Sequence, residues 1–250
     1  MEQHTAMLRA EHISKYYDGR CIISDISLHL MPGEIVCLVG VSGAGKTTLF
    51  HTLSGLERPE EGHVFLQGQE ITGCPGKISY MLQRDLLLPH KKIIDNVSLP
   101  LVIGGQSKKG ARAAAEPYFA QFGLSGTEEK YPAQLSGGMR QRAALLRTFL
   151  GSKGVVLLDE PFSALDALTK REIHRWYLET MAQLQLTTLF ITHDIDEAIL
   201  LSNRVYILSG KPGAITAELQ IHAPHPRDLS FTLSGQFLDY KKEILSLLGA

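Results

Sequence analysis

Residues Gly40–Thr47 match the pattern G-x-x-x-x-G-K-[ST] in full. The glycines let the backbone curl so that successive N–H groups face inward toward a phosphate. Lys46 supplies a positive charge for the β- and γ-phosphates, and the Thr47 hydroxyl can bind Mg²⁺. A helix expected from about Thr47 to Ser54 adds its positive end. The pattern predicts a nucleotide site formed by this phosphate loop and the next residue: Gly40, Val41, Ser42, Gly43, Ala44, Gly45, Lys46, Thr47 and Thr48.

Two acidic residues, Asp159 and Glu160, follow the apolar run Val155–Leu158. The carboxyl end of a buried strand is where ligands bind in open α/β sheets. Asp159 can hold Mg²⁺, directly or through water, and Glu160 can orient or deprotonate an attacking water. An acid pair at this position is alternatively a simple helix cap. The phosphate loop upstream favours the hydrolytic interpretation.

A second glycine-rich element reads Leu-Ser-Gly-Gly-Met-Arg-Gln-Arg over residues 135–142. Ser136, Gly137 and Gly138 open an expected helix, so their N–H groups and hydroxyl form a second anion site. Serine is also a good N-cap on its own, which makes the short S-G-G motif weak. Two such helix starts on separate parts of one chain are poorly placed to hold one nucleotide. A two-fold dimer would bring them together, with the nucleotide clamped between two copies.

Short apolar strands alternate with helices along most of the chain, which predicts an α/β fold with a parallel sheet. A mostly helical insert is expected over 85–153, with Pro117 interrupting a helix over 107–122. Trp176 and Tyr177 lie on the apolar face of a later helix and are interpreted as core residues. Strands are expected at 7–14, 22–30, 35–39, 63–67, 78–83, 155–158, 187–191, 205–208 and 215–221, and further helices at 139–150, 167–183, 196–201 and 236–248.

Composition restricts the possible partners and location. With 250 residues, 44% of them apolar, the chain can form one large domain or two small ones. The net charge of −1 provides no basic field, so no nucleic-acid partner is expected. The three cysteines lack metal or disulfide spacing, which fits a reducing compartment. Neither a signal peptide nor an 18-residue apolar span is found, so we expect a soluble protein that reaches a membrane only through another chain.

The complete octapeptide at 135–142, together with the phosphate loop, resembles the ATP-binding cassette subunits of ABC transporters over nearly the whole chain. The resemblance implies a P-loop NTPase (RecA-like) core with a parallel sheet, an N-terminal antiparallel β subdomain and a helical insert that carries the signature motif. It implies one ABC ATPase domain over 1–250. The core is expected at 1–84 and 155–222, the helical subdomain at 85–154 and a C-terminal helical tail at 223–250.

The resemblance also implies roles for single residues. Gln83 matches the residue that senses Mg²⁺ and the γ-phosphate, and His193 matches the switch histidine that contacts the γ-phosphate. With Glu160 they form the expected catalytic set, while Thr47, Gln83 and Asp159 are the expected Mg²⁺ ligands. Tyr17 matches the aromatic residue that stacks on adenine, with Tyr16 as an alternative. Ser163–Asp166 match the loop that bridges two cassettes, so Asp166 joins Ser136, Gly137 and Gly138 in the ATP site of the dimer.

Three segments, 86–97, 131–134 and 160–168, look like the nitrate/sulfonate/taurine-type importers. The resemblance implies an ATPase that pairs with a second copy or a paralogous cassette and docks on permease subunits at the cytoplasmic side of the inner membrane. A solute-binding protein would be an indirect partner. The apolar run Leu86–Leu88 is either an exposed docking patch for the permease or part of the buried helical insert.

Two other classes of function share some or all of these motifs. A cassette ATPase that regulates another membrane complex, without transport, shares all these motifs. A DNA-repair or translation factor is disfavoured by the single cassette and the absence of a basic stripe. A P-loop kinase or GTPase is disfavoured by Ser136–Met139 and by the lack of a base-specificity motif such as N-K-x-D.

Overall fold

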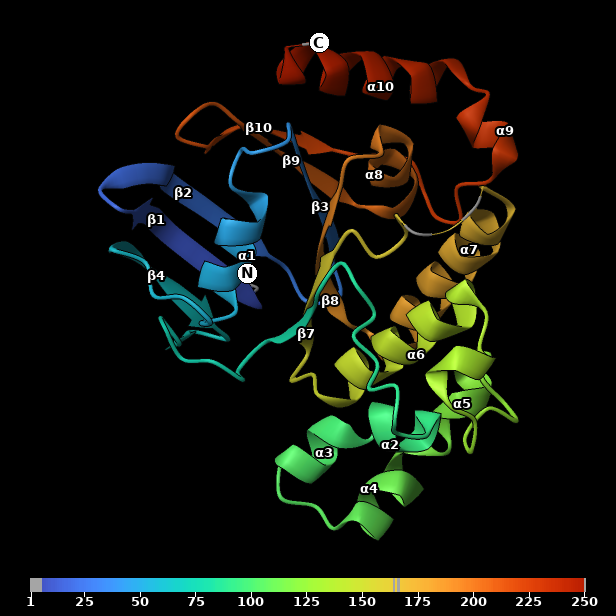
Figure 1. The fold of residues 1–250 in the computed structure, drawn as a ribbon. Helices are drawn as coiled ribbons and strands as arrows, with labels where there is room; N and C mark the ends of the chain where they lie inside the picture. The colour runs from blue at the N-terminus through green and yellow to red at the C-terminus, as the bar shows by residue number, and fades with distance from the viewer. Residues whose placement is uncertain (1–5, 164, 166, 250) are drawn as a thin grey trace, which may run out of the picture.

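The computed structural model describes residues 6–163, 165 and 167–249, which form two β-sheets and surrounding helices (Figure 1). A four-stranded antiparallel sheet has the order β2-β1-β4-β5, and a six-stranded sheet has the order β10-β9-β3-β8-β7-β6. The expected fold class, a parallel-sheet core with an N-terminal antiparallel subdomain, is confirmed. The strands are β1 (Leu8–Tyr17), β2 (Arg20–Leu30), β3 (Ile35–Gly40), β4 (Glu61–Leu66), β5 (Gln69–Glu70), β6 (Ser79–Met81), β7 (Val155–Asp159), β8 (Thr187–Thr192), β9 (Arg204–Ser209) and β10 (Ala214–Gln220).

Strands β6, β7, β8, β3 and β9 run parallel, and β10 closes one edge antiparallel to β9. Because parallel strands end at the same edge of a sheet, the register brings their last residues together. Val39 pairs with Thr192, and Asp159 pairs with Ile191. The chain segments that follow β3, β7 and β8 therefore emerge side by side, and these segments carry the expected site residues.

Each central strand is buried on both faces and feeds two hydrophobic cores. In β3, Ile35, Cys37 and Val39 belong to one core, and Val36 and Leu38 to the other. This alternation follows from the period-two geometry of a strand. Helix α1 (Lys46–Leu53) packs into the second core and α6 (Gly137–Leu150) into the first. Helices α1 and α6 therefore lie on opposite faces of the sheet (Figure 1).

The segment between β6 and β7 contains helices and no described strand. Pro117 interrupts the expected helix over 107–122, because its backbone nitrogen carries no hydrogen to donate. The elements are α2 (Ile93–Val97), α3 (Leu99–Ile103), α4 (Lys108–Ala115), α5 (Tyr118–Gln121), a 3₁₀ turn (Pro132–Gln134) and α6. Helices α2 and α3 are too short for a clear apolar period and were not expected individually.

One expectation from the sequence needs correction, and one pair of alternatives that the sequence left open is narrowed. The strand expected at 78–83 ends at Met81, so Gln83 lies in the loop beyond it. Strand β6 lies at the edge of the six-stranded sheet and pairs with β7, and its length depends on that pairing rather than on its own apolar pattern. Within Leu86–Leu88, Leu86 is 51% exposed but Leu87 is only 7% exposed and packs in the core. The run is therefore not a continuous exposed patch.

The remaining helices complete the layers around the large sheet. Helix α7 (Ala167–Leu184) buries Tyr177 completely, as expected, whereas Trp176 is half-buried and donates its indole N–H to the Gln121 carbonyl at 2.9 Å. Helix α8 (Ile195–Leu201) lies beside α10 (Gly235–Leu248), which crosses the top of Figure 1 after the short α9 (Leu229–Thr232). Within the described ranges, none of these helices has the length and apolarity to cross a bilayer.

Candidate nucleotide-binding and hydrolysis site

The phosphate loop connects β3 to α1, as expected from the sequence. Gly43 and Gly45 adopt φ angles of 78° and 91°, a left-handed region that other residues rarely occupy. At Gly45 a Cβ atom would also lie 2.4 Å from Cγ2 of Ile23 in β2. The second glycine of the pattern is therefore required both by its backbone angle and by the close packing of β2. Lys46, Thr47 and Thr48 follow in the first turn of α1.

The Lys46 ammonium folds back over the loop. Its Nζ donates to the carbonyl of Gly40 at 2.7 Å and to that of Val41 at 3.0 Å. Burial lowers the pKa of Lys46, while the nearby carboxylates of Glu160 and Asp159 act in the opposite direction. The lysine thus occupies the space between the loop and the two acids. A phosphate bound there would replace the two carbonyls as its partner.

Asp159 is the last residue of β7 and is buried. Burial raises the pKa of its carboxyl group, and the neighbouring Glu160 charge adds to this effect. The hydroxyl of Tyr80, on the adjacent strand β6, donates to Oδ2 of Asp159 at 3.2 Å and opposes the rise. Tyr80 was missed in the sequence. Its position could be found only from the pairing of β6 with β7, in which Tyr80 lies opposite Leu157.

The three residues expected to be catalytic are brought together at Glu160. The Gln83 side-chain amide donates to Oε2 of Glu160 at 2.9 Å, and Nδ1 of His193 lies 3.3 Å from Oε1. Glu160 has a φ of 47°, which is uncommon for a residue with a side chain, and its N–H donates to the Ile191 carbonyl at 3.0 Å. The Glu160 side chain is 19% exposed and that of His193 is 65% exposed. The carboxylate therefore remains accessible from the solvent side.

The two adjacent tyrosines differ in their surroundings. The Tyr17 hydroxyl donates to Glu57, whose own N–H donates to the carbonyl of His51 in α1 at 3.1 Å. Burial, followed by the Glu57 contact, raises the pKa of Tyr17 to about 12. Tyr16 instead contacts Cys21 on the neighbouring strand. Of the two tyrosines, Tyr17 is therefore the one that is linked, through Glu57, to the helix that follows the phosphate loop.

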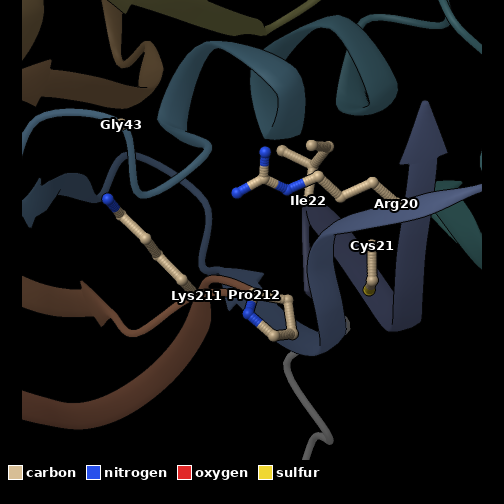
Figure 2. A pocket seen from close by; sticks show the side chains of 6 residues that line it. All are labelled: Arg20, Cys21, Ile22, Gly43, Lys211 and Pro212. Carbon is tan, nitrogen blue, oxygen red and sulfur yellow. The ribbon is translucent and has the colours of Figure 1, made fainter. Parts of the chain in front are cut away.

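A cavity of about 500 Å³ lies beside the phosphate loop at Gly43. Figure 2 shows the side chains of Arg20 and Lys211 extending into the space beside this loop, with Ile22 nearby. Arg20 and Lys211 were not expected from the sequence. The loop 211–213 comes here because Gly213 bonds to β2: its N–H donates to the Ile22 carbonyl at 2.8 Å. Two cations beside a phosphate loop suit an anionic ligand.

Other expected site residues lie elsewhere. The Ser136 hydroxyl caps α6 by accepting the Met139 N–H at 3.3 Å. Helices α6 and α1 pack on opposite faces of the sheet. Ser136, Gly137 and Gly138 at the start of α6 are therefore not packed together with the phosphate loop at the start of α1. Ser163 donates its hydroxyl to the Glu160 carbonyl at 3.1 Å. Asp166 lies outside the described residues.

The donor groups at this edge fit Mg²⁺ in one particular way. The described residues contain no group of three or more His, Cys, Asp or Glu side chains arranged as a metal site. Mg²⁺, however, is usually held by one or two carboxylates together with water and substrate phosphates. The buried Asp159 carboxylate and the Thr47 hydroxyl at the start of α1 supply such a partial set. The chemistry of these donors therefore suits Mg²⁺ that arrives with a nucleotide.

Comparison with known proteins identifies a family and several similar chains. The family model described as "ABC transporter" matches residues 23–163. The formylaminopyrimidine import ATP-binding protein ThiZ of Halalkalibacterium halodurans is 43% identical over 245 residues, covering 97% of this chain and 96% of that protein. The nitrate import ATP-binding protein NrtD of Synechocystis is 38% identical, covering 90% of this chain and 87% of that protein.

A solved structure is similar in fold. The dimeric structure of the ATP-binding cassette MJ0796, in a post-hydrolysis state bound to ADP and Pi, superimposes with a TM-score of 0.74 at 27% sequence identity. The alignment covers 87% of this chain and 100% of the other. The relatives thus match this chain over most of its length, well beyond the phosphate loop.

Proposed function

Because the chain belongs to the ABC transporter family, as an ATPase whose hydrolysis of ATP is coupled to transport, we propose that it drives an importer of a small solute of the nitrate/sulfonate/taurine type. The relatives named for import of formylaminopyrimidine, nitrate and aliphatic sulfonates support import over export. The segments 86–97, 131–134 and 160–168 favour the same branch.

The contact of Gln83 and His193 with the Glu160 carboxylate is the observation that carries the proposed chemistry. Glu160 takes a proton from the attacking water, and the other two side chains hold the carboxylate in place and meet the γ-phosphate. Lys46 exchanges its two loop carbonyls for phosphate oxygens. Asp159 and Thr47, with Gln83, would hold Mg²⁺, which when bound neutralises charge on the triphosphate.

Two copies of the chain complete the site in this proposal. The phosphate loop and Tyr17 of one copy bind the nucleotide, and Ser136, Gly137 and Gly138 of the second copy, or of a paralogous cassette, close over it. Asp166 would act in the bridge between them. The opposite placement of α1 and α6 and the dimeric form of the MJ0796 cassette support this arrangement.

The assembly would sit at the cytoplasmic face of the inner membrane. We propose permease subunits as direct partners, with the 85–154 helical subdomain facing them, and a solute-binding protein as an indirect partner. The core at 1–84 and 155–222 carries the nucleotide chemistry, and the tail at 223–250 covers α8. Attachment is peripheral, through the permease.

The substitution Glu160→Gln tests the chemistry and the dimer together. Glutamine keeps the shape but removes the base, and general-base catalysis contributes about 10²- to 10⁴-fold, so turnover should fall by about that factor. Size-exclusion chromatography with Mg-ATP should then show a stable dimer of the variant. Exposed Glu243→Gln on α10 is the matched control and should behave as wild type. The proposal would be contradicted if Glu160→Gln hydrolysed ATP at the wild-type rate. It would also be contradicted if the variant stayed strictly monomeric with saturating ATP and the permease present.

A further inference from the structure

A second cavity, of about 560 Å³, lies away from the phosphate loop between α7, α8 and the segment 226–232. These three elements lie beside one another on the right of Figure 1, where α9 leads into α10. The volume falls within the range of pockets that enclose small molecules, about 300–1,000 Å³. None of the residues expected to bind nucleotide lines it.

Positive charge predominates among the residues that line this cavity. Arg171 and Arg175 are exposed and stand four residues apart, which places them on the same face of α7. Neither arginine forms an ion pair within the described part of the chain. Their guanidinium groups are therefore available to a ligand, and two guanidinium forks suit a carboxylate, sulfonate or phosphate group.

A third arginine, Arg227, also lines the cavity. Arg227 is buried and donates to the backbone carbonyls of Ile199, Ser202, Ile221 and Ala223, none of which neutralises its charge. Burial lowers the pKa of Arg227 to about 10, which leaves it cationic at neutral pH. Two acids, Glu179 and Asp228, also line the cavity, but Asp228 is occupied by N–H donors of Ser230 and Phe231.

The rest of the lining is apolar. Leu178 and Leu200 are partly buried, Leu201 is buried, and Leu229 is 55% exposed at the start of α9. Exposure of a leucine beside exposed arginines is the pattern of a site that takes an apolar body with a charged head. An inorganic anion would leave these leucines in water, and an uncharged molecule would leave the arginines without a partner.

The cavity also contacts the hydrolytic loop through His174. The His174 ring packs edge-on against Phe162 with 4.7 Å between centroids, and Phe162 follows Glu160 by two residues. Nε2 of His174 lies 3.6 Å from Oε1 of Glu197, too far for a hydrogen bond. A ligand that moves His174 would therefore press on the segment that carries the catalytic carboxylate.

We propose that this cavity binds a small organic anion with an apolar body, such as an alkyl carboxylate or alkyl sulfonate, with the head on Arg171 and Arg175 and the body against the leucines. The site is separate from the proposed nucleotide site, and its occupancy does not depend on ATP hydrolysis. Contact through His174 and Phe162 gives it a route to change the rate of that hydrolysis.

Isothermal titration calorimetry with 1-octanesulfonate tests the proposal. The intact chain is first saturated with Mg-ADP, so that a sulfonate cannot bind at the phosphate loop. Octanesulfonate should bind with one-to-one stoichiometry, and 1-octanol or inorganic sulfate should bind at least about tenfold more weakly, because each lacks one half of the recognition. The double variant R171Q/R175Q should weaken binding by at least about tenfold, since each arginine supplies a charge-assisted hydrogen bond.

Matched controls separate a specific site from general charge effects. The double variant K153Q/K242Q removes the same charge from exposed positions outside the cavity and should leave the affinity unchanged. Thermal denaturation establishes that each variant is folded, and L229D gives a second, independent test by placing a negative charge on the rim. No heat of binding at millimolar octanesulfonate, equal binding by R171Q/R175Q, or equal binding of inorganic sulfate would each overturn the proposal.

Discussion

Gly213 offers a test of how the phosphate loop is positioned. A Cβ atom at this position would lie 1.9 Å from the carbonyl oxygen of Ala44, in the middle of the loop. The glycine cannot retreat, because its N–H donates to the Ile22 carbonyl at 2.8 Å and its carbonyl accepts the Ser24 N–H at 2.9 Å. In Gly213→Ala the loop must therefore move instead. The Ala44 carbonyl must shift by roughly 1.5 Å to bring this 1.9 Å clash to an ordinary van der Waals distance.

A displacement of that size matters because the loop acts through the positions of its N–H groups. Misplacement by about 1 Å in a binding or catalytic constellation costs up to about 10²-fold. We expect ATP affinity to fall about 10- to 100-fold, while overpacking lowers the free energy of unfolding by about 1–3 kcal/mol. Titration with a fluorescent ATP analogue measures the first quantity, and chemical denaturation measures the second.

The control for this substitution is another glycine-to-alanine change. Gly235, at the start of α10, has no atom within 4 Å of a Cβ position and no positive φ. Gly235→Ala should bind nucleotide as wild type does and should be at least as stable, because alanine favours the helix. If Gly213→Ala also binds with wild-type affinity, then β2 does not hold the loop in place and the reasoning from packing fails.

Three further predictions follow from the same structure. Leu87→Asp should lower the free energy of unfolding by more than about 3 kcal/mol because it buries a charge. Leu86→Asp should change it by less than about 0.5 kcal/mol, and chemical denaturation measures both. Equal effects of the two substitutions would contradict the different burial of the two residues. Burial raises the pKa of Glu197, but the nearby His174 ring, the Lys170 ammonium at 2.8 Å and the hydrogen bond from the Thr192 hydroxyl outweigh it and lower the pKa to about 2. This folded pKa lies below the unfolded value, so the Glu197 carboxylate stabilises the fold above about pH 4.5 and loses that effect as the pH falls toward 2. Glu197→Gln should therefore lower the free energy of unfolding by about 3 kcal/mol at pH 7 and by clearly less at pH 3.5, as measured by chemical denaturation at the two pH values. Tyr80→Phe removes the hydrogen bond to Asp159 and should raise the Mg²⁺ concentration for half-maximal ATP hydrolysis about tenfold, with no such rise if Tyr80 only fills space.

The elements that could be predicted from the sequence are those whose signal is local. The phosphate loop needs glycines at fixed offsets, and Asp159 and Glu160 directly follow an apolar run, so both are visible in a single stretch of chain. The opposite faces of β3 could also be anticipated from its unbroken apolar run, which is typical of a strand buried on both sides. The expected roles of Gln83 and His193 came from the family resemblance, because the spacing of these residues in the sequence does not indicate a site on its own.

Other features depend on neighbours that are distant in the chain. Tyr80 reaches Asp159 only because β6 pairs with β7, and Gly213 matters only because its loop returns to β2 and the phosphate loop. The end of β6 at Met81 depends likewise on a distant neighbour, since the last residue of β6 that pairs with β7 is Met81, opposite Leu158. The burial of Leu87 beside the exposed Leu86 reflects how one turn of loop meets α2 and α6, which an apolar run does not reveal.

The two-sided sheet accounts for the proposed need for a partner. Each strand of the centre divides its side chains between two cores, so α1 and α6 are fixed on opposite faces by the same residues that bury the sheet. Moving the Ser136 end of α6 to the phosphate loop of the same chain would expose one of these cores. Exposing apolar surface costs about 25 cal/mol for each Å². Summed over a whole helix face, this cost is far larger than the free energy gained from one phosphate contact. A second copy can supply Ser136 with neither core disturbed. The nucleotide would then be held by two rigid halves, and loss of the γ-phosphate would remove the group that both halves contact.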